Sequence, residues 1–264
     1  MRNSLIYLFS MLKNDLPVSA DASEQDLFGF ADAPASFQYE QADIIFLSSY
    51  FNCGFNPSAL DEQTRVFFEL SVNAFDAFIH AWMSEPPVEA EMLRFGRRVT
   101  ASAASGSEKE RVAAEMAASD RSNADTLAVL NAAARVQFEI HRMMGLLRFF
   151  PDANGVYIAK CAPDNLILPA LGEYFTERFG ETAWAVIDEK RDLILRRLHG
   201  EQTKVLTHDG NPAVCGGDEW EDLWLHYHKT INNESRKNPA LQRQFMPERY
   251  WKYLPEKLGM RNEE

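Results

Sequence analysis

The chain has 264 residues, 46% of them hydrophobic, which is enough to bury one large core or two modest ones. Its formal net charge of -12 and its pI of about 5.0 exclude a protein that is coated with phosphate-binding cations. Cys53, Cys161 and Cys215 lie far apart and form no C-x-x-C pair. Neither a disulfide framework nor a cysteine-ligated cluster is therefore expected, and a reducing compartment, the cytoplasm, fits best.

The first residues combine features of a signal peptide with those of a folded element. Arg2 precedes an apolar run at residues 5–12, and V-S-A at residues 18–20 is similar to a small-residue cleavage site. The polar residues K-N-D at 13–15 interrupt this pattern. We therefore expect a first buried strand or helix here. No apolar run reaches the length that crosses a membrane, so no membrane partner is expected.

The next part of the chain is predicted to be mainly helical. Residues 43–51 form an apolar run that fits a buried strand, and residues 64–83 have the apolar spacing of one long helix. The following helix, over residues 88–99, carries Arg94, Arg97 and Arg98, which we expect on a solvated face. An alanine-rich helix is predicted over residues 108–118.

A strongly periodic helix organises the centre of the chain. Ser122, with Asp125 three residues on, is similar to a capping box and predicts its start, and Gly145 predicts its end. Its core face is a stripe at helical spacing, formed by Val136, Ile140, Met143 and Leu147.

After this helix the pattern changes to that of strands. Residues 146–150 and 156–161 predict a hairpin that turns at Asn154-Gly155, and residues 182–187 and 193–198 predict another. Between them, Asp164 or Asn165 would cap a helix that Gly180 closes. This order of elements predicts an α+β fold, with an antiparallel sheet built from hairpins and covered by helices.

The C-terminal region is basic on an otherwise acidic chain, because residues 229–261 hold eight Lys or Arg against three Glu. One helix should follow Gly216-Gly217, and Pro239 and Pro247 should begin two short ones. Interleaved cations and aromatic rings suit single-stranded nucleic acid, since each stacked base contributes about 1–3 kcal/mol. Alternatively, the rings pack on the core and the charges are merely solvated. The residues concerned are Arg243, Arg249, Lys252 and Lys257, with Phe245, Tyr250, Trp251 and Tyr253.

Several large enzyme classes lack their motifs in this chain. It has no G-x-x-x-x-G-K-[ST] phosphate loop, no G-x-G-x-x-G dinucleotide fingerprint and no G-x-S-x-G elbow. His226 and His228 lie two residues apart in a predicted helix and would point away from each other. We therefore expect neither a cofactor nor a metal site.

Two places could carry chemistry. Glu139 and His141 could act as acid and base near a helix end, although His141 could equally satisfy that end as a cation. Arg148 follows within an apolar strand, where an unpaired charge would cost several kcal/mol. Its guanidinium should therefore meet a ligand phosphate or a structural carboxylate, Glu139 or Glu173.

Several separate blocks of sequence resemble one known family. The blocks are EIHRMMGLLRF at 139–149, Pro163 with LGEYFTERF at 171–179, WAVIDEKR at 184–191, LW at 223–224 and RKNPALQRQFMPERYWKYLPE at 236–256. In matching order, over about residues 70–258, they are similar to the probable DNA metabolism protein family. That family is a domain of unknown function encoded beside a putative DNA modification or repair radical SAM protein, and it is often fused to a uracil-DNA glycosylase domain.

The resemblance implies DNA repair or DNA modification with a radical SAM partner, and it implies no known reaction. We hypothesise that the DNA is single-stranded or damaged. It divides the chain into an N-terminal segment (1–69), the family domain (70–258) and a tail (259–264). No glycosylase motif is present, so uracil excision by this chain alone is not expected. The motif positions that match the family pattern are His141, Arg142, Arg148, Phe149, Arg178, Asp188, Arg236, Asn238, Pro247, Tyr250 and Trp251.

Three functions remain open at this point. The favoured one is an accessory protein that binds nucleic acid and acts with the radical SAM partner. The second is an enzyme acting on a flipped base, with Glu139 and His141 as acid and base. The third is a protein-binding module without DNA contact, whose acidic body docks a basic enzyme. The candidate nucleic-acid or phosphate-binding residues are Arg142, Arg148, Arg178, Arg236, Arg243, Arg249, Tyr250, Trp251 and Lys252.

Overall fold

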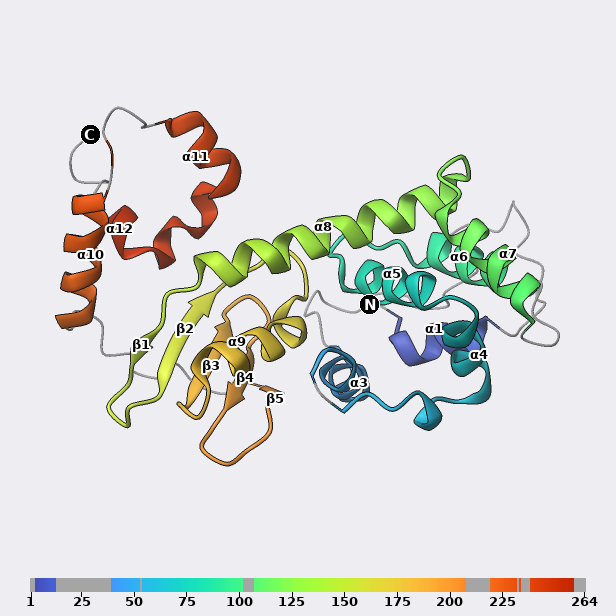
Figure 1. The fold of residues 1–264 in the computed structure, drawn as a ribbon, viewed down its shortest axis with the longest axis horizontal. Coiled ribbons are helices and arrows are strands. Elements are labelled where there is room, and N and C mark those ends of the chain that lie inside the picture. Colours follow the sequence, from blue (N-terminus) through green and yellow to red (C-terminus); the bar gives the residue numbers. More distant parts are fainter. Residues whose placement is uncertain are drawn as a thin grey trace, which may run out of the picture. The chain divides into compact units, whose positions relative to one another are not determined.

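The structure is a computed structural model that describes residues 3–12, 39–52, 54–101, 107–207, 219–231, 233 and 238–258 (Figure 1). The chain divides into two compact units. The first unit holds Met1–Phe46 and Phe55–Val136, and the second holds Leu47–Gly54 and Gln137–Glu264. Of the three boundaries, one falls inside the helix α3 (Gln41–Phe51) and one inside the helix α8 (Ala124–Leu146), and the third lies between Gly54 and Phe55.

The first unit is helical and has an aromatic core. The Phe9 ring stacks on Phe75 and Phe78, with centroids 5.2 and 5.1 Å apart, and Phe67 packs edge-on against Phe78. All four rings are buried, and such contacts add to the burial of their area. Besides the first part of α8, the unit contains α1 (Leu5–Met11), η1 (Pro57–Ala59), α4 (Glu62–Leu70), α5 (Val72–Met83), α6 (Glu89–Thr100) and α7 (Glu108–Ser119).

Three predictions in this part of the chain are confirmed and two are wrong. The helix predicted over residues 88–99 is α6. The first apolar run does form a buried element, α1, and the alanine-rich helix exists as α7. The predicted strand at residues 43–51 is the helix α3, because a short apolar run fits either structure. The predicted helix over residues 64–83 is two helices, since Ser71 is extended and its hydroxyl caps α5 at the Ala74 amide.

The arginine trio of α6 is tied into the first unit. Arg94 pairs with Asp125 at 2.9 Å, Arg98 pairs with Asp120, and Arg97 donates to the Met11 carbonyl. Arg94 is exposed as predicted, but Arg97 and Arg98 are half-buried, and all three side chains bind residues of neighbouring elements.

The second unit is built on a five-stranded sheet in the order β1-β2-β3-β4-β5 (Figure 1). β1 pairs antiparallel with β2, and β3 pairs antiparallel with β4, which confirms both predicted hairpins. β3 is the central strand and all five of its residues are buried. The strands are β1 (Phe150–Pro151), β2 (Tyr157–Cys161), β3 (Trp184–Asp188), β4 (Leu193–Arg197) and β5 (Lys204–Thr207).

One pair of strands departs from the predicted antiparallel sheet. β2 and β3 are parallel, with Cys161 opposite Asp188 at their ends. A parallel pair needs a crossover, and here it contains η2 (Leu168–Leu171) and α9 (Gly172–Phe179), which lie against the sheet. The α+β class is confirmed, and both strands of this pair end at the same edge.

Three local predictions in and around the second unit need correction. α8 continues to Leu146, so the predicted strand at 146–150 shrinks to the two residues of β1. Asn123 caps α8 through the Thr126 amide, whereas Ser122 hydrogen-bonds to Asp120. Asp164 and Asn165 cap no helix. Their amides instead bind Glu139.

The C-terminal helices largely follow the prediction. Pro239 is the first residue of α11 (Pro239–Phe245), and Pro247 directly precedes η4 (Glu248–Tyr253). α10 (Glu219–Ile231) places His226 and His228 on a helix, and α12 (Pro255–Leu258) ends the described chain. Three apolar side chains of α10 are exposed, those of Leu223, Tyr227 and Ile231.

Candidate functional site

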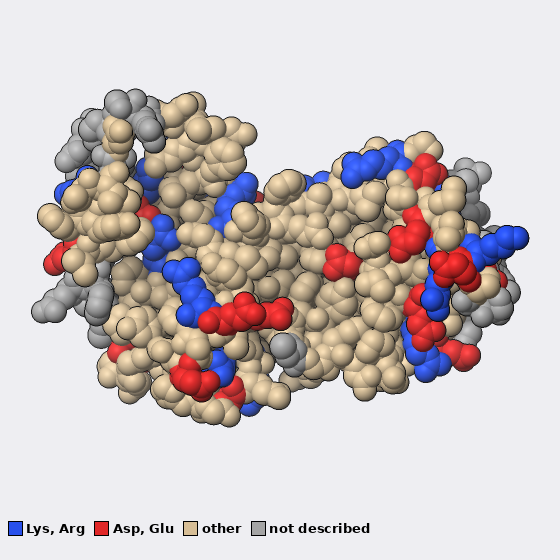
Figure 2. Space-filling model, viewed as in Figure 1, with Lys and Arg blue, Asp and Glu red and all other residues tan. Residues whose placement is uncertain are grey.

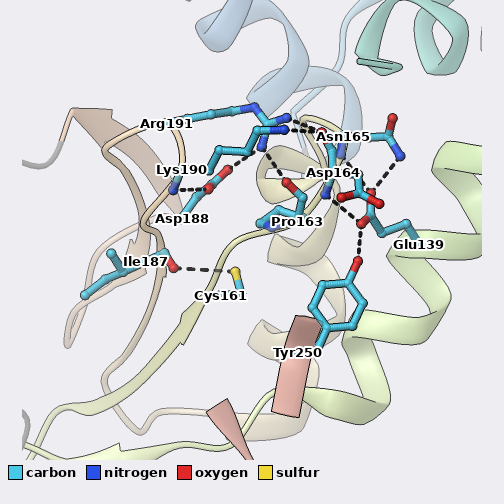
Figure 3. A network of polar contacts seen from close by, with 10 residues as sticks. All are labelled: Glu139, Cys161, Pro163, Asp164, Asn165, Ile187, Asp188, Lys190, Arg191 and Tyr250. Carbon is cyan, nitrogen blue, oxygen red and sulfur yellow. Dashed lines mark hydrogen bonds and ion pairs between the residues drawn. The ribbon is translucent and has the colours of Figure 1, made fainter. Parts of the chain in front are cut away.

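The candidate site lies where β2 and β3 end together. Because these strands are parallel, the loops that follow Cys161 and Asp188 leave the sheet at one edge. Ligands commonly bind outside the carboxyl ends of parallel strands, where loops carry polar side chains. In this protein the two loops meet a buried carboxylate from α8 and an aromatic residue from η4 (Figure 3).

Glu139 is the buried centre of this arrangement, with only 2% of its surface exposed. One carboxylate oxygen accepts the Asp164 amide at 2.8 Å and the Tyr250 hydroxyl at 2.5 Å. The other accepts the Asn165 amide at 2.9 Å and its side-chain Nδ2 at 2.7 Å. Four donors replace the water that the carboxylate loses, so the charge is tolerated in the core.

The electrostatics of this centre hold Tyr250 in its neutral form. Burial raises the pKa of the Tyr250 phenol, and its hydrogen bond to the Glu139 carboxylate raises it further. A neutral phenol is a donor, which is the role that the Glu139 oxygen needs. Tyr250 therefore ties η4 to α8 across the edge of the sheet.

A second buried pair supports the loop from the other side. Asp188 and Arg191 lie 3.0 Å apart, and their side chains are 0% and 2% exposed. Burial raises the pKa of Asp188, and the positive charge of Arg191 opposes that shift. Arg191 also donates to the carbonyl oxygens of Pro163 and Asp164, at 3.1 and 2.6 Å. The loop carrying Asp164 is therefore held at both its amides and its carbonyls (Figure 3).

Cys161 lies beside this pair, where burial keeps its thiol protonated and away from solvent. Its sulfur contacts the Ile187 carbonyl at 3.4 Å and the residue is 1% exposed. Burial raises the pKa of the Cys161 thiol well above its usual range, and the nearby Asp188 charge raises it further.

Cationic side chains surround the exposed rim of the site. Lys190 donates to the Asp164 carbonyl at 3.1 Å, and Arg249 pairs with the Asp164 carboxylate at 2.6 Å. Lys252 and Lys160 lie 3.7 and 4.0 Å from Glu189. The Asp164 and Arg249 side chains are about half exposed, at 52% and 47%. Charges buried below the rim hold its backbone, and charges at the rim remain accessible to solvent.

The predicted acid and base are not brought together. Glu139 is buried and has all four acceptor positions filled, whereas His141, two residues on along α8, is exposed. Residues two apart on a helix point to nearly opposite sides. Glu139 therefore serves as an anchor for the loop and for Tyr250.

Arg148 has a structural partner that the sequence did not suggest. Its guanidinium pairs with Glu256 at 2.7 Å, and it lies over the Trp224 ring, 5.0 Å from the centroid. Trp224 in turn donates to the second oxygen of Glu256 at 3.2 Å. Neither Glu139 nor Glu173 is the partner of Arg148. The carboxylate from α12 satisfies the charge of Arg148 and ties α10 and α12 to the end of α8.

The tail aromatic residues do not form a stacking surface. Tyr250 is 2% exposed, and Trp251 is half-buried, with its indole N–H on the Met246 carbonyl and the Lys257 ammonium 4.7 Å from its ring. Phe245 is different, since it is 65% exposed. Of the two interpretations of the tail, core packing describes Tyr250, whereas the ring of Phe245 is exposed enough for a base to stack on it.

The other predicted binding residues are dispersed or paired. Arg243 pairs with Glu248 at 3.1 Å, and Arg178 is exposed and donates to the Tyr174 hydroxyl at 3.5 Å. Arg142 is half-buried on α8, and Arg236 lies outside the described residues. On the face drawn in Figure 2, described basic and acidic side chains are interspersed and form no broad basic surface. The rim around Asp164 brings together Arg249 and Lys252, together with cations the sequence had not singled out.

Sequence reasoning missed four residues of the site, namely Asp164 and Asn165 as loop anchors and Lys190 and Arg191 as cations that hold the loop. Three of them, Asp164, Lys190 and Arg191, lie in or beside sequence blocks that carry the family resemblance. The resemblance could therefore have pointed to these residues, but it does not predict their contacts. Within the described ranges, no group of three or more His, Cys, Asp or Glu could hold a metal ion. None of the described helices is long and apolar enough to span a membrane.

Comparison with known protein families gives one match, and it covers this region. The model of a domain of unknown function, DUF4130, matches residues 108–256, which is more than half of the chain. The chain belongs to the DUF4130 family. Every residue of the site described above falls within the DUF4130 match. No curated protein and no solved structure matches the chain.

Proposed function

We propose that this DUF4130 protein binds nucleic acid as an accessory in DNA repair or DNA modification, and that it acts with a radical SAM enzyme. One observation carries the proposal. Blocks of sequence that resemble the probable DNA metabolism protein family, far apart along the chain, meet around Asp164. They contribute Glu139, Lys190, Arg191 and Arg249 to a single site at the carboxyl edge of β2 and β3.

The chemistry of the rim supports contact with phosphates more than contact with bases. Lys190, Arg249 and Lys252 all have exposed side chains. Lys190 and Arg249 contact Asp164 in the loop after β2, and Lys252 lies 3.7 Å from Glu189 in the loop after β3. Two aromatic residues that could have stacked on bases have partners in the protein. The Tyr250 hydroxyl donates to Glu139, and the Lys257 ammonium lies over the Trp251 ring. Cations that meet phosphates supply affinity that does not depend on sequence and that falls steeply with salt. The net charge of -12 restricts such contact to a local surface.

The DNA contact is tested by fluorescence anisotropy of a labelled oligothymidylate of about 15 nucleotides. A triple variant, Lys190→Gln, Arg249→Gln and Lys252→Gln, should bind more weakly than the wild type. If all three cations meet phosphates, the slope of log K against log salt should fall in magnitude by about 2, since each single-strand contact contributes about 0.7. A slope equal to that of the wild type would exclude the rim as the binding surface.

A matched control removes the same charge elsewhere. Lys109, Arg111 and Lys204 are exposed and lie on α7 and β5, away from the rim cluster in sequence and in its contacts. Replacing these three by Gln should leave the salt slope unchanged. Circular dichroism and thermal melting of both triple variants show whether each retains the fold.

The partner part of the proposal has its own test. The protein is co-expressed with a radical SAM enzyme of the kind that the family resemblance implies, and affinity purification is repeated after nuclease treatment. Co-purification that survives the nuclease supports direct association. If the complex survives and no DNA binding is measured at low salt, the protein is a protein-binding module, and the DNA contact proposed here is wrong.

A further inference from the structure

We propose that Arg249 and Lys190 form a binding subsite for one phosphate group of a single-stranded nucleic acid, and that the Asp164 carboxylate occupies this subsite in the free protein. The inference rests on the proposed function and names the chemistry of its contact. The carboxylate of Asp164 lies 2.6 Å from an Arg249 Nη, which is the distance of a charge-assisted hydrogen bond. A phosphate oxygen makes the same bond to a guanidinium.

The position of Asp164 is fixed by its backbone and not by its side chain. Its amide donates to Glu139, and its carbonyl accepts from Arg191 and Lys190, at 2.6 and 3.1 Å. The Glu139 and Arg191 side chains that hold it are both buried. The Asp164 side chain, 52% exposed, can therefore leave Arg249 without loss of the loop conformation.

Arg249 is likewise held in place without its ion pair. Its guanidinium lies 4.7 Å from the centre of the Tyr250 ring, and Tyr250 is anchored to Glu139. Such stacking orients a guanidinium and leaves its N–H edge available to an acceptor. The Lys190 ammonium donates to the Asp164 carbonyl, and Arg249 pairs with the Asp164 carboxylate. Two cations on rigid supports thus converge on one residue whose side chain is free to move.

Exchange of a carboxylate for a phosphate is energetically feasible at this location. An ion pair between half-exposed side chains contributes little, since water and salt screen it. The described rim and its support hold five cationic side chains, Lys160, Lys190, Arg191, Arg249 and Lys252, against four carboxylates, Glu139, Asp164, Asp188 and Glu189. Displacement of Asp164 leaves an excess of positive charge that an arriving phosphate neutralises.

A double-mutant cycle tests the inference. Asp164→Asn keeps the size of the side chain and its backbone contacts but removes the charge that competes for Arg249. The variant should bind an unphosphorylated oligothymidylate about 2- to 5-fold more tightly than the wild type, with a steeper salt dependence. In the Arg249→Gln background the same substitution should have no effect, because the cation for which the Asp164 carboxylate competes is absent.

Two controls separate the subsite from a general effect of charge. Glu177→Gln removes one exposed carboxylate from α9, outside the rim, and should leave affinity unchanged. The same oligothymidylate with a 5′-phosphate distinguishes the source of the ligand group. A gain for both oligonucleotides identifies an internal phosphodiester, and a gain only for the phosphorylated one identifies a terminal phosphate. Either gain supports a phosphate subsite.

The outcomes also separate this inference from the proposed function. If the wild type binds DNA and Asp164→Asn binds equally, or if the gain persists without Arg249, the subsite is wrong and the function stands. If no variant binds DNA, the proposed function fails. In that case inorganic phosphate is titrated into ¹⁵N-labelled Asp164→Asn protein, and the Arg249 Nε–H signal is identified by its absence in the Arg249→Gln variant. A shift of that signal supports the subsite, and an unchanged signal refutes it.

Discussion

Replacement of Glu139 by Gln should destabilise the protein more than any substitution at its surface. The Glu139 carboxylate accepts four hydrogen bonds, two at each oxygen. In Gln an NH₂ group replaces one oxygen, so two donors lose their acceptor and face another donor. Hydrogen bonds to a charged group contribute about 1.5–3 kcal/mol each, and the loss of two costs about 3–6 kcal/mol. That is a large part of the total stability of a typical protein, about 5–15 kcal/mol.

The measurement is urea unfolding followed by far-UV circular dichroism, for Glu139→Gln, Tyr250→Phe and the double variant. Tyr250→Phe removes one of the four donors and should cost about 1.5–3 kcal/mol. The double variant should lose less unfolding free energy than the sum of the two single losses. When the side-chain nitrogen of the new Gln faces Tyr250, both substitutions remove the same hydrogen bond.

His141→Gln is the matched control for this series. His141 is exposed on the same helix and makes no part of the Glu139 cluster, so its replacement should change stability by less than about 0.5 kcal/mol. A loss below about 1 kcal/mol for Glu139→Gln would refute the anchoring role. Unchanged stability together with loss of function in a reconstituted system would return Glu139 to the role of a catalytic acid or base.

Two further predictions concern stability in the second unit. Gly172→Ala should destabilise by about 2 kcal/mol, because the added Cβ would lie 1.8 Å from Asn52 Oδ1 and displace a side chain that donates to the Ser48 and Pro169 carbonyls. In an Asn52→Ala background the loss should be much smaller, because only the contact with Thr203 Cγ2 at 3.0 Å remains, and an equal loss in both backgrounds would contradict the clash with Asn52. Burial acts to raise the pKa of Glu256, but hydrogen bonds, above all from Arg148, outweigh it and leave this pKa below its usual value. The stability that the Glu256 carboxylate contributes is complete above about pH 4.5 and is lost as the pH falls through the folded pKa. In urea titrations, the difference in unfolding free energy between the wild type and Glu256→Gln should therefore shrink below that pH. A difference that stays constant with pH would refute the pairing.

The sequence predicts the elements whose signals are local. α8 has a sustained helical period, and both hairpins combine short strand patterns with turn residues such as Asn154-Gly155. The predictions fail where one or two residues decide between structures. Ser71 divides a continuous helical pattern because its extended backbone and its hydroxyl begin a new helix. The apolar run in α3 is too short to distinguish a helix from a strand.

The geometry of the site depends on contacts between residues far apart in sequence. Glu139 meets Asn165 and Tyr250, which lie 26 and 111 positions away. The parallel pairing of β2 and β3, which aligns the two loops, also has no local signal in strands this short. Arg148 shows the same limit, because the sequence shows that it needs an anionic partner and offers no means of choosing Glu256, 108 positions away.

The most direct test of the central proposal is the affinity of the purified wild-type protein for labelled single-stranded and duplex DNA, from about 50 to 200 mM salt, measured by fluorescence anisotropy. Contact between the rim cations and phosphates predicts binding that weakens linearly in a plot of log K against log salt, and that is lost in part when Lys190, Arg249 and Lys252 become Gln. Absence of binding to both DNAs at the lowest salt would contradict the proposal that this protein contacts nucleic acid.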